Sequence, residues 1–308
     1  MAHRHSNTRN NDTIRLNDFN YIDKTLILNT QRSTYYHMLI TNRCMDYDFP
    51  NGLSIRKLYE YDQQICPLHK SKFGNQIGIN GLIITSDGYV LIEKRDHKKT
   101  TWKNKFAQSI SLALKEDEVI LNENGVIGNT CEDAAASLKH VIQKTIRKNF
   151  GLTSGEDYSQ EFVLEKNFLG LARDLLEGGK PNLYFFVEVK YTAEAFAKRL
   201  KETAGSIEDG KAIGTEKLYS DYYLVKFSDI EINYNYVMNL DRKKAIKVER
   251  RVYPRVTLKT QVEDRIKHLL ARIFRPKLQR ECGEALLVSL SYLELCKDRI
   301  DSLKHTER

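Results

Sequence analysis

The feature that most constrains the fold is a β-hairpin pattern between residues 77 and 94. An apolar, β-branched run from Ile77 to Thr85 is followed by Ser86-Asp87-Gly88, and Tyr89 to Lys94 returns as a second apolar run. Asp and Gly tolerate the positive φ values of a tight turn, so the two runs are predicted to be paired strands. The chain is therefore expected to build a β-sheet here.

Further strands and helices alternate downstream of this hairpin. Strands are predicted over residues 106–114, 162–171, 182–190 and 222–227, and a short helix over residues 193–203. This alternation predicts a mixed α/β layer.

A longer helix has a recognisable start and end. Thr130-Cys-Glu-Asp133 resembles a capping box, in which a hydroxyl and a carboxylate satisfy the first free N–H groups. Apolar residues follow at helical spacing, and Gly151 fits the left-handed position just past the end. The helix is thus expected to run from about residue 130 to residue 150.

Four regions are predicted from these patterns. Residues 1–15 are expected to be a disordered tail, and residues 16–74 a small N-terminal segment that shows no recognisable fold. Residues 75–228 carry the α/β pattern, and residues 229–308 are expected to form a basic, helical C-terminal extension. The extension's two apolar helix faces, over residues 262–273 and 282–296, leave open pairing within one chain or across a homodimer.

Composition excludes several classes of protein. No run approaches eighteen apolar residues, so a membrane-spanning helix is not expected. The first twenty residues lack the apolar core of a secretory signal, which favours a cytoplasmic location. The five cysteines are far apart and form no CxxC pair, so they indicate neither a disulfide framework nor a zinc site.

Positive charge is concentrated in one segment. Residues 242–280 hold fourteen Lys and Arg against three acids, an excess of +11 in a chain whose net charge is +8. Such a field attracts polyanions, which makes a nucleic acid or an acidic protein a candidate partner, although a solvated helix face explains the charge equally well. The candidate nucleic-acid contacts are Arg250, Arg251, Arg255 and Lys259.

The stretch from about 77 to 190 resembles the Nudix family. The resemblance rests on the hairpin GLIITSDGYVLIEKR (residues 81–95), on Trp102 and Phe106, and on the helix that ends NFGL (residues 149–152). It implies a Nudix-like α/β/α sandwich with a mixed sheet. It also implies a nucleotide or another phosphorylated small molecule as the ligand, and Mg²⁺ as the cofactor of an active enzyme.

The Nudix box, the sequence motif of this family, is degenerate in this chain. When the box is aligned on Gly151 and Leu152, the positions that hold magnesium in the family fall on Thr145, Lys148 and Asn149. Magnesium prefers carboxylate and phosphate oxygens, so these side chains cannot hold it with protein charge. The usual metal-dependent cleavage is therefore expected to be lost, with no metal site or cofactor. Two alternatives stay open. One is that the alignment on Gly151 and Leu152 is wrong, and the other is that acids elsewhere rebuild a site: Glu116, Asp117, Glu118 or Glu165.

Six residues are candidates for contacts with a ligand: Lys94, Arg95, Trp102, Gln108, Ser109 and Lys148. The resemblance places the first pair beside the substrate, where their cations suit a phosphate, although an exposed strand end is the plainer interpretation. Trp102 could stack on a base or act as a packing anchor. Lys148 would put an ammonium where the metal charge normally sits, or simply complement the C-terminal end of its helix.

Three functions remain open at this point. The leading hypothesis is a Nudix-like module that binds a nucleotide or another phosphorylated ligand without hydrolysing it. The second is an active hydrolase of a nucleoside diphosphate derivative with unconventional metal ligands. The third is a nucleic-acid or protein interaction module that uses the basic segment 242–280.

Overall fold

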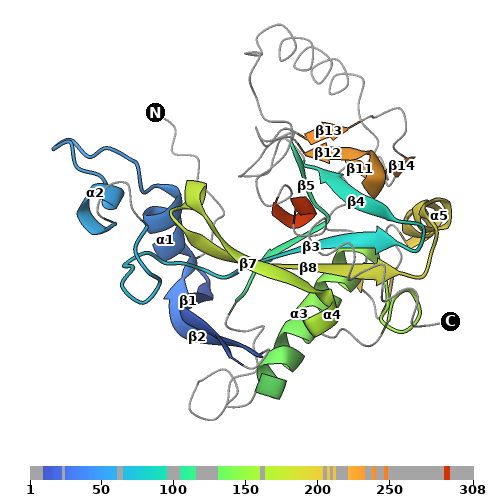
Figure 1. Cartoon of the computed structure of the whole chain (residues 1–308), viewed down its shortest axis with the longest axis horizontal. Helices are drawn as coiled ribbons and strands as arrows, with labels where there is room; N and C mark the ends of the chain where they lie inside the picture. The colour runs from blue at the N-terminus through green and yellow to red at the C-terminus, as the bar shows by residue number, and fades with distance from the viewer. Residues whose placement is uncertain are drawn as a thin grey trace, which may run out of the picture.

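A mixed eight-stranded sheet forms the centre of the computed structural model (Figure 1). The structure describes residues 10–22, 25–60, 65–95, 105–115, 131–159, 164–203, 207–208, 211–212, 221–232, 238–240, 246–248 and 288–291. Six strands follow one another across the sheet in the order β14-β11-β4-β3-β8-β7. Their bounds are β3 Gly78–Thr85, β4 Tyr89–Lys94, β7 Phe168–Asp174, β8 Lys180–Val189, β11 Asp221–Lys226 and β14 Ile246–Val248. The predicted α/β class with a mixed sheet is confirmed.

The predicted hairpin forms, but its two strands separate after a few residues. β3 pairs with β4 only at Ile83↔Leu91 and Ile84↔Val90. Beyond that point β5 (Phe106–Gln108) pairs with β4, and β6 (Ile110–Ala113) pairs with β3. The single strand expected over 106–114 is therefore two strands, because the chain changes partner at Ser109.

The pair β3–β8 is the parallel part of the sheet. Its register runs from Gly78↔Asn182 to Thr85↔Val189. The ring of Phe185 lies across Gly81, where a Cβ atom would meet the Cε2 atom at 2.5 Å. A residue without a side chain is needed here for the ring to cover β3.

Two helices cover one face of the sheet. They are α3 (Cys131–Phe150) and α5 (Ala193–Thr203), and α3 runs below β3 and β8 in Figure 1. α3 buries Val141, Ile142, Ile146 and Phe150 in the same core as Phe196 of α5. It ends as predicted, because Gly151 has a φ of 70° and its N–H donates to the Arg147 carbonyl at 2.8 Å. The apolar stripe fixes which side of α3 meets the sheet.

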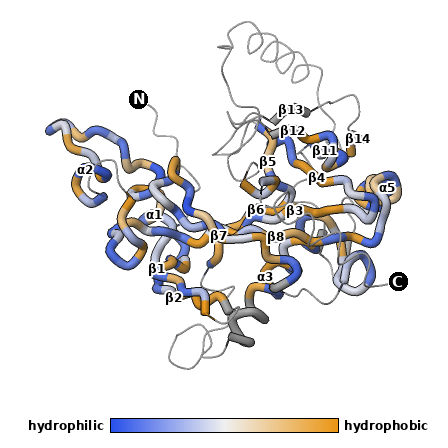
Figure 2. Tube along the Cα trace, in the orientation of Figure 1, coloured by the Kyte–Doolittle hydropathy of each residue, from blue (hydrophilic) through white to orange (hydrophobic). Residues whose placement is uncertain are grey.

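The opposite face of the sheet carries a second, smaller core. It contains Leu82 and Ile84 of β3, Val90 and Ile92 of β4, and Phe186 of β8. Leu290, in the short helical piece 288–291, is fully buried against this core. Figure 2 shows that hydrophobic residues are frequent along the central strands β3 and β8.

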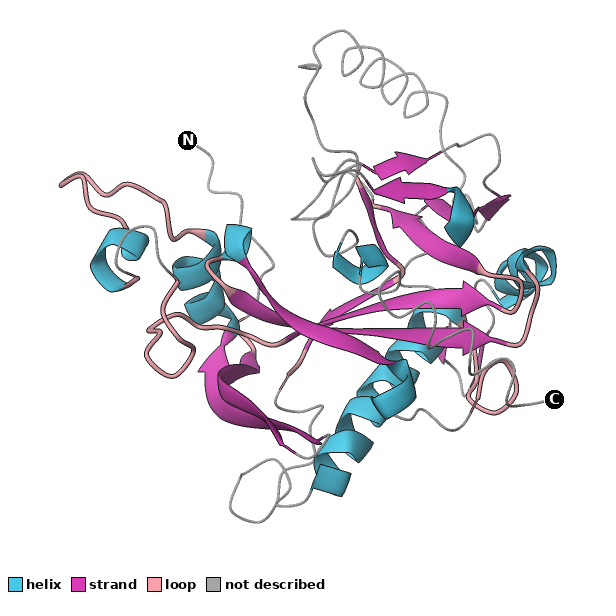
Figure 3. Cartoon of the chain, in the orientation of Figure 1, coloured by secondary structure: helices cyan, strands magenta, loops and turns pink. Residues whose placement is uncertain are grey.

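The N-terminal segment packs into the main core. It contains β1 (Asp12–Ile22), β2 (Thr25–Thr34), α1 (Tyr35–Met38), the π-helical turn η1 (Leu39–Arg43) and α2 (Ile55–Tyr59) (Figure 3). The Ile77 N–H donates to the Ile14 carbonyl at 3.0 Å, and the Ile14 and Leu16 side chains lie in the core that α3 covers. The disordered tail predicted over residues 1–15 is therefore wrong for residues 12–15, because burial of this apolar pair holds the strand.

Two further predictions need correction. The strand expected over residues 162–171 begins only at residue 168 and is preceded by α4 (Leu164–Asn167). The C-terminal region expected to be helical from residue 229 begins with β12 (Ile230–Ile232) and β13 (Met238–Leu240), and Val248 of β14 is buried in the main core. β14 belongs to the central sheet because it pairs with β11.

The remaining short elements complete the description. They are the 3₁₀ turns η3 (Leu175–Glu177) and η4 (Phe227–Asp229) and the paired strands β9 (Ile207–Glu208) and β10 (Lys211–Ala212). Within the described residues, no helix is both long and apolar enough to cross a membrane. The apolar helix face predicted over 262–273 and most of the basic segment 242–280 lie outside the described residues.

Candidate functional site

Polar side chains gather on the sheet face that lies opposite α3. Strand alternation puts Asn80 on the same face as Leu82, and the register places Ser111 opposite Asn80. Gln108 pairs with Ile92, which also belongs to the core of this face. The half of the face next to Ile84 is thus apolar, whereas the half next to Asn80 is polar.

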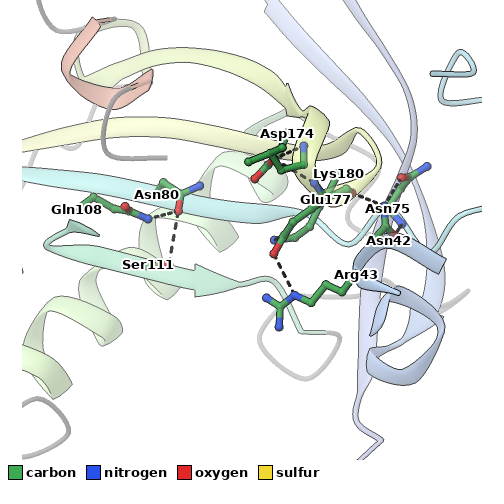
Figure 4. A network of polar contacts seen from close by, with 10 residues as sticks. Asn42, Arg43, Asn75, Asn80, Gln108, Ser111, Asp174, Glu177 and Lys180 are labelled. Carbon is green, nitrogen blue, oxygen red and sulfur yellow. Dashed lines mark hydrogen bonds and ion pairs between the residues drawn. The ribbon is translucent and has the colours of Figure 1, made fainter. Parts of the chain in front are cut away.

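Asn80 is the centre of this polar half. Its Oδ1 accepts hydrogen bonds from Gln108 Nε2 at 2.6 Å and from Ser111 Oγ at 3.5 Å (Figure 4). Its Nδ2 is buried and has no hydrogen-bond partner among the described residues, and the residue is only 5% exposed. A buried donor without a partner costs about 1–3 kcal/mol, which an incoming acceptor would recover. The amide therefore presents a donor that a ligand can use.

Two more polar side chains extend the site along β8. Lys180 and Asn182 share the face of Tyr184, which belongs to the smaller core. A Cβ atom on Gly78 would clash with Asn182 Oδ1 and would lie 3.6 Å from Lys180 Nζ. Glycine at this position leaves the room in which the Asn182 amide and the Lys180 ammonium lie over β3.

The Lys180 ammonium is held by a network of charges at the start of β8. Its Nζ lies 2.9 Å from Glu177 Oε2, and Arg43 Nε lies 3.0 Å from Glu177 Oε1. Burial raises the pKa of Glu177, but the charges of Lys180 and Arg43 outweigh burial and hold it below its usual value. Burial, followed by the charge of Glu177, raises the pKa of Asp174. This network fixes the position of one cation beside the polar half of the sheet.

Two predicted contact residues share this face. Lys94 is half-buried at the end of β4 and pairs in register with Phe106, so it points to the same side as Ile92 and Gln108. The Arg95 N–H donates to the Lys105 carbonyl at 2.9 Å and extends the pairing of β4 with β5. Trp102 lies outside the described residues. The structure thus brings Lys94 and Gln108 to one face, and their contact with a ligand stays a prediction.

The hydroxyl of Ser109 is engaged by the backbone. Ser109 is fully buried at the point where the hairpin opens. Its Oγ accepts from the Ile83 N–H at 3.0 Å and donates to the Gly81 carbonyl at 3.4 Å. These backbone groups lie where β3 leaves β4, so the side chain replaces hydrogen bonds that a continuous strand pair would make.

Lys148 lies on a different side of the sheet. It is exposed on α3, which packs on the face opposite Asn80 and Gln108. Of the aligned box positions, Thr145 donates its hydroxyl to the Val141 carbonyl at 2.8 Å, and Asn149 is buried. One small ligand at the Asn80 site would not reach Lys148 as well.

Most of α3 offers no carboxylate to a magnesium ion. Residues 134–150 contain no Asp or Glu, and the side chains of Glu132 and Asp133 near the start of the helix lie outside the described residues. Among the described residues, no three His, Cys, Asp or Glu side chains lie close enough together to share a metal ion. Glu116, Asp117 and Glu118 are outside the described residues, and only the backbone of Glu165 is described.

Sequence reasoning missed Asn80, Asn182, Lys180 and the fully buried Glu93. Glu93 pairs in register with Tyr222, whose ring contacts that of Phe150 on α3 with centroids 5.6 Å apart. Side chains alternate between the two faces of a strand. On β4 this alternation predicts that Glu93 lies on the buried face of Leu91, and on β3 it predicts that Asn80 lies on the face of Leu82. The position of Lys180 depends on contacts with η3 and η1 and had no local signal.

Three chains illustrate the solved structures to which this chain is similar. Tm1382, provisionally described as a Nudix hydrolase, is 16% identical with a TM-score of 0.28, over 50% of this chain and 59% of its own length. DR0079 from Deinococcus radiodurans is 14% identical with a TM-score of 0.23, over 45% of this chain and 62% of its own. The MutT protein from Methanosarcina mazei Go1 is 14% identical with a TM-score of 0.25, over 50% of this chain and 78% of its own.

This chain thus spans about three fifths of the first two of these proteins. No protein-family model matches the sequence, and the search of curated proteins finds no relative. The fold described above rests on strand order and register. The candidate nucleic-acid contacts Arg250, Arg251, Arg255 and Lys259 lie outside the described residues.

Proposed function

We propose that this chain is a Nudix-like module that binds a nucleotide or another phosphorylated ligand without metal-dependent hydrolysis. The observation that carries the proposal is the buried Asn80 Nδ2, which has no hydrogen-bond partner in the part of the chain that the structure describes, on a sheet face that also carries Lys94 and Lys180. Amides hydrogen-bond to an uncharged polar edge, and ammonium groups attract phosphate. The two kinds of group on one face suit a ligand that has both parts.

The order of elements supports the Nudix-like assignment. A hairpin opens around the inserted strands β5 and β6, and a parallel strand β8 follows. α3 covers one face and ends in Gly151-Leu152, as the sequence resemblance implies. Residues 134–150 of α3 carry no carboxylate, which supports the loss of hydrolysis, because magnesium takes carboxylate oxygens that this segment does not supply.

Isothermal titration of the full chain with ADP, ADP-ribose and a UDP-sugar tests binding. The Asn80→Asp substitution keeps the side-chain oxygen that accepts from Gln108 and Ser111 but replaces the Nδ2 donor by a second oxygen. The affinity for whichever probe the wild type binds is therefore expected to fall at least about tenfold. Asn29→Asp is the matched control, because Asn29 is exposed on β2. Equal affinities in wild type and Asn80→Asp would refute the amide's role.

The cationic part of the site has a separate test. Lys94→Gln is expected to weaken ADP binding and to reduce its salt dependence, whereas Lys201→Gln, on the exposed side of α5, leaves both unchanged. No binding of any phosphorylated probe by the wild-type chain would overturn the proposed function.

A magnesium assay separates binding from hydrolysis. The full chain is incubated with Mg²⁺ and the same probes, and release of a monophosphate is followed by chromatography. The expected result is intact probe. Magnesium-dependent release would instead establish the alternative of an active hydrolase, with ligands outside residues 134–150 of α3.

A further inference from the structure

Three segments of chain meet at one point next to the candidate site. The Ile14 N–H of β1 donates to the Leu114 carbonyl at 3.4 Å, the Leu114 N–H donates to the Ile77 carbonyl at 3.0 Å, and the Ile77 N–H donates to the Ile14 carbonyl at 3.0 Å. All three side chains lie in the main core, on the side that α3 covers. Their neighbours in the sequence therefore point to the opposite side, which is the face of Asn80.

The neighbours on this face are Thr13 and Arg15 of β1 and Gln76, which precedes β3. Arg15 pairs with Gln76 across the two segments. Thr13 is 1% exposed and Gln76 is 2% exposed, so both are almost completely buried, whereas Arg15 is half-buried. We refer to these three residues as the junction cluster.

Each member of the junction cluster has a buried polar atom without a partner. Within the part of the chain that the structure describes, Thr13 Oγ1, Arg15 Nε and Gln76 Oε1 make no hydrogen bond, either with one another or with a further group. The Arg15 guanidinium bonds instead through Nη2, which donates to the Ser71 carbonyl at 3.0 Å. Unsatisfied buried groups are rare in folded proteins. Three of them on neighbouring residues indicate a place for a molecule that the chain itself does not supply.

The charge of Arg15 favours an anion over ordered water as that molecule. Burial lowers the pKa of Arg15, and no carboxylate among the described residues counteracts this effect. Water can satisfy a hydroxyl and an amide, but it has no charge to balance a guanidinium that is partly removed from solvent. A phosphate accepts hydrogen bonds from a guanidinium and from a hydroxyl, and the Gln76 amide can turn over to donate its NH₂ group as well.

The junction cluster borders the site around Asn80. On this face of β3 the order is Gln76, Gly78 and Asn80, and successive positions are about 6.6 Å apart. At this level β1 and β8 lie on opposite edges of β3, since Gly78 pairs with Asn182 of β8 on one edge and Ile77 bonds to Ile14 on the other. Strands two places apart are about 10 Å from each other. The cations of Arg15 and Lys180 therefore belong to strands that flank β3 at that separation.

We propose that the junction cluster binds a second phosphate group of the ligand, the first being held beside Asn80 by the Lys180 ammonium. This inference rests on the proposed function, and it narrows the ligand to a compound with two separate phosphate groups, such as a nucleoside bisphosphate. It also makes β1 of the N-terminal segment a part of the ligand site, through Thr13 and Arg15.

Isothermal titration of the full chain with two matched pairs of probes tests the proposal. The pairs are AMP with adenosine 3′,5′-bisphosphate, and ADP-ribose with ADP-ribose 2′-phosphate. In the wild type, the added phosphate is expected to improve affinity at least about tenfold in one pair or both. Arg15→Gln is expected to remove this gain and to leave the affinity for the probe without the added phosphate unchanged.

Two further variants accompany Arg15→Gln. Arg32→Gln is the matched control, because Arg32 is exposed on β2 and pairs with Ile14, so its side chain lies on the other side of the hairpin from Arg15. It is expected to keep the gain. Thr13→Val removes the buried hydroxyl with little change of shape and is expected to reduce the gain, which keeps the proposal falsifiable if Arg15→Gln does not fold.

Three outcomes would overturn the proposal. A wild-type chain that binds both members of each pair equally would refute the second phosphate site but not the proposed function, and would assign the junction cluster to ordered water. An unchanged gain in folded Arg15→Gln or Thr13→Val would place the second phosphate elsewhere. A wild-type chain that binds no member of either pair would overturn the proposed function together with this inference.

Discussion

Replacing Ser109 by alanine tests how the sheet is held open. The hydroxyl accepts from the Ile83 N–H at 3.0 Å, and both residues are fully buried. Alanine leaves this N–H inside the core without a partner and also removes the weaker bond to the Gly81 carbonyl. An unsatisfied buried donor costs about 1–3 kcal/mol, so the free energy of unfolding is expected to fall by about 2 kcal/mol. In large domains each kcal/mol lowers Tm by about 2–4 °C, which predicts a shift of about 4–8 °C.

Urea denaturation and thermal unfolding of the full chain measure the effect. Ser111→Ala is the matched control, because Ser111 is exposed and its only described bond is the 3.5 Å contact with Asn80. It is expected to change the unfolding free energy by less than about 0.5 kcal/mol. If both variants unfold like the wild type, the hydroxyl does not support the opened hairpin. Normal ligand affinity in folded Ser109→Ala would further separate this structural role from a role in binding.

Three further predictions concern the packing around the sheet. Gly151→Ala is expected to destabilise more than Gly88→Ala, because both glycines have positive φ but only at Gly151 would a Cβ meet Thr203, at 2.8 Å; chemical denaturation of both variants compares the two costs. Leu290→Ala is expected to cost about 2–5 kcal/mol, since Leu290 is fully buried against the smaller core; a loss below about 1 kcal/mol would contradict that packing. Glu177 has a lowered pKa in the folded chain, so its stabilising effect is present above the pKa of the unfolded chain and is lost as pH falls through the folded value. The stability gap between wild type and Glu177→Gln is therefore expected to shrink as pH falls from about 6 to below 4, and a constant gap in pH-dependent denaturation would refute this.

Local sequence patterns predicted the helices and strands whose signals lie within a single element. The β3–β4 hairpin, α3, α5 and β11 lie within a few residues of their predicted positions. Turn chemistry, helical spacing of apolar residues and a C-terminal glycine each act over one element, so the sequence is a sufficient guide to them.

Other elements depend on partners that are distant in the chain. Residues 106–114 have uniform strand character, yet they divide at Ser109 because β5 pairs with β4 and β6 pairs with β3. β1 is ordered because Ile14 reaches the core and its carbonyl accepts from Ile77, more than sixty residues away. Strand pairing over such separations leaves no local signal.

The candidate site likewise contains residues that the sequence predicted and residues that only the tertiary contacts bring together. Lys94 and Gln108 became candidates through the family resemblance of the strands that carry them, and they share a face as alternation allows. Alternation from Leu82 indicates the face of Asn80, but the closeness of Asn182 and Lys180 to β3 became visible only when β3, β8 and η3 were placed together. Sequence reasoning grouped Lys148 with the first pair, but the apolar stripe of α3 puts that helix on the other face.

The sequence alone determined the chemistry that α3 can offer. Residues 134–150 carry four lysines and arginines and no acid, which holds for any arrangement of the helix. Tertiary structure decided where each group acts, because the side of a sheet on which a helix packs follows from its contacts with distant strands. Burial of Val141 and Ile146 turns Lys144 and Lys148 outward, and the opened hairpin places the Asn80 amide on the opposite face.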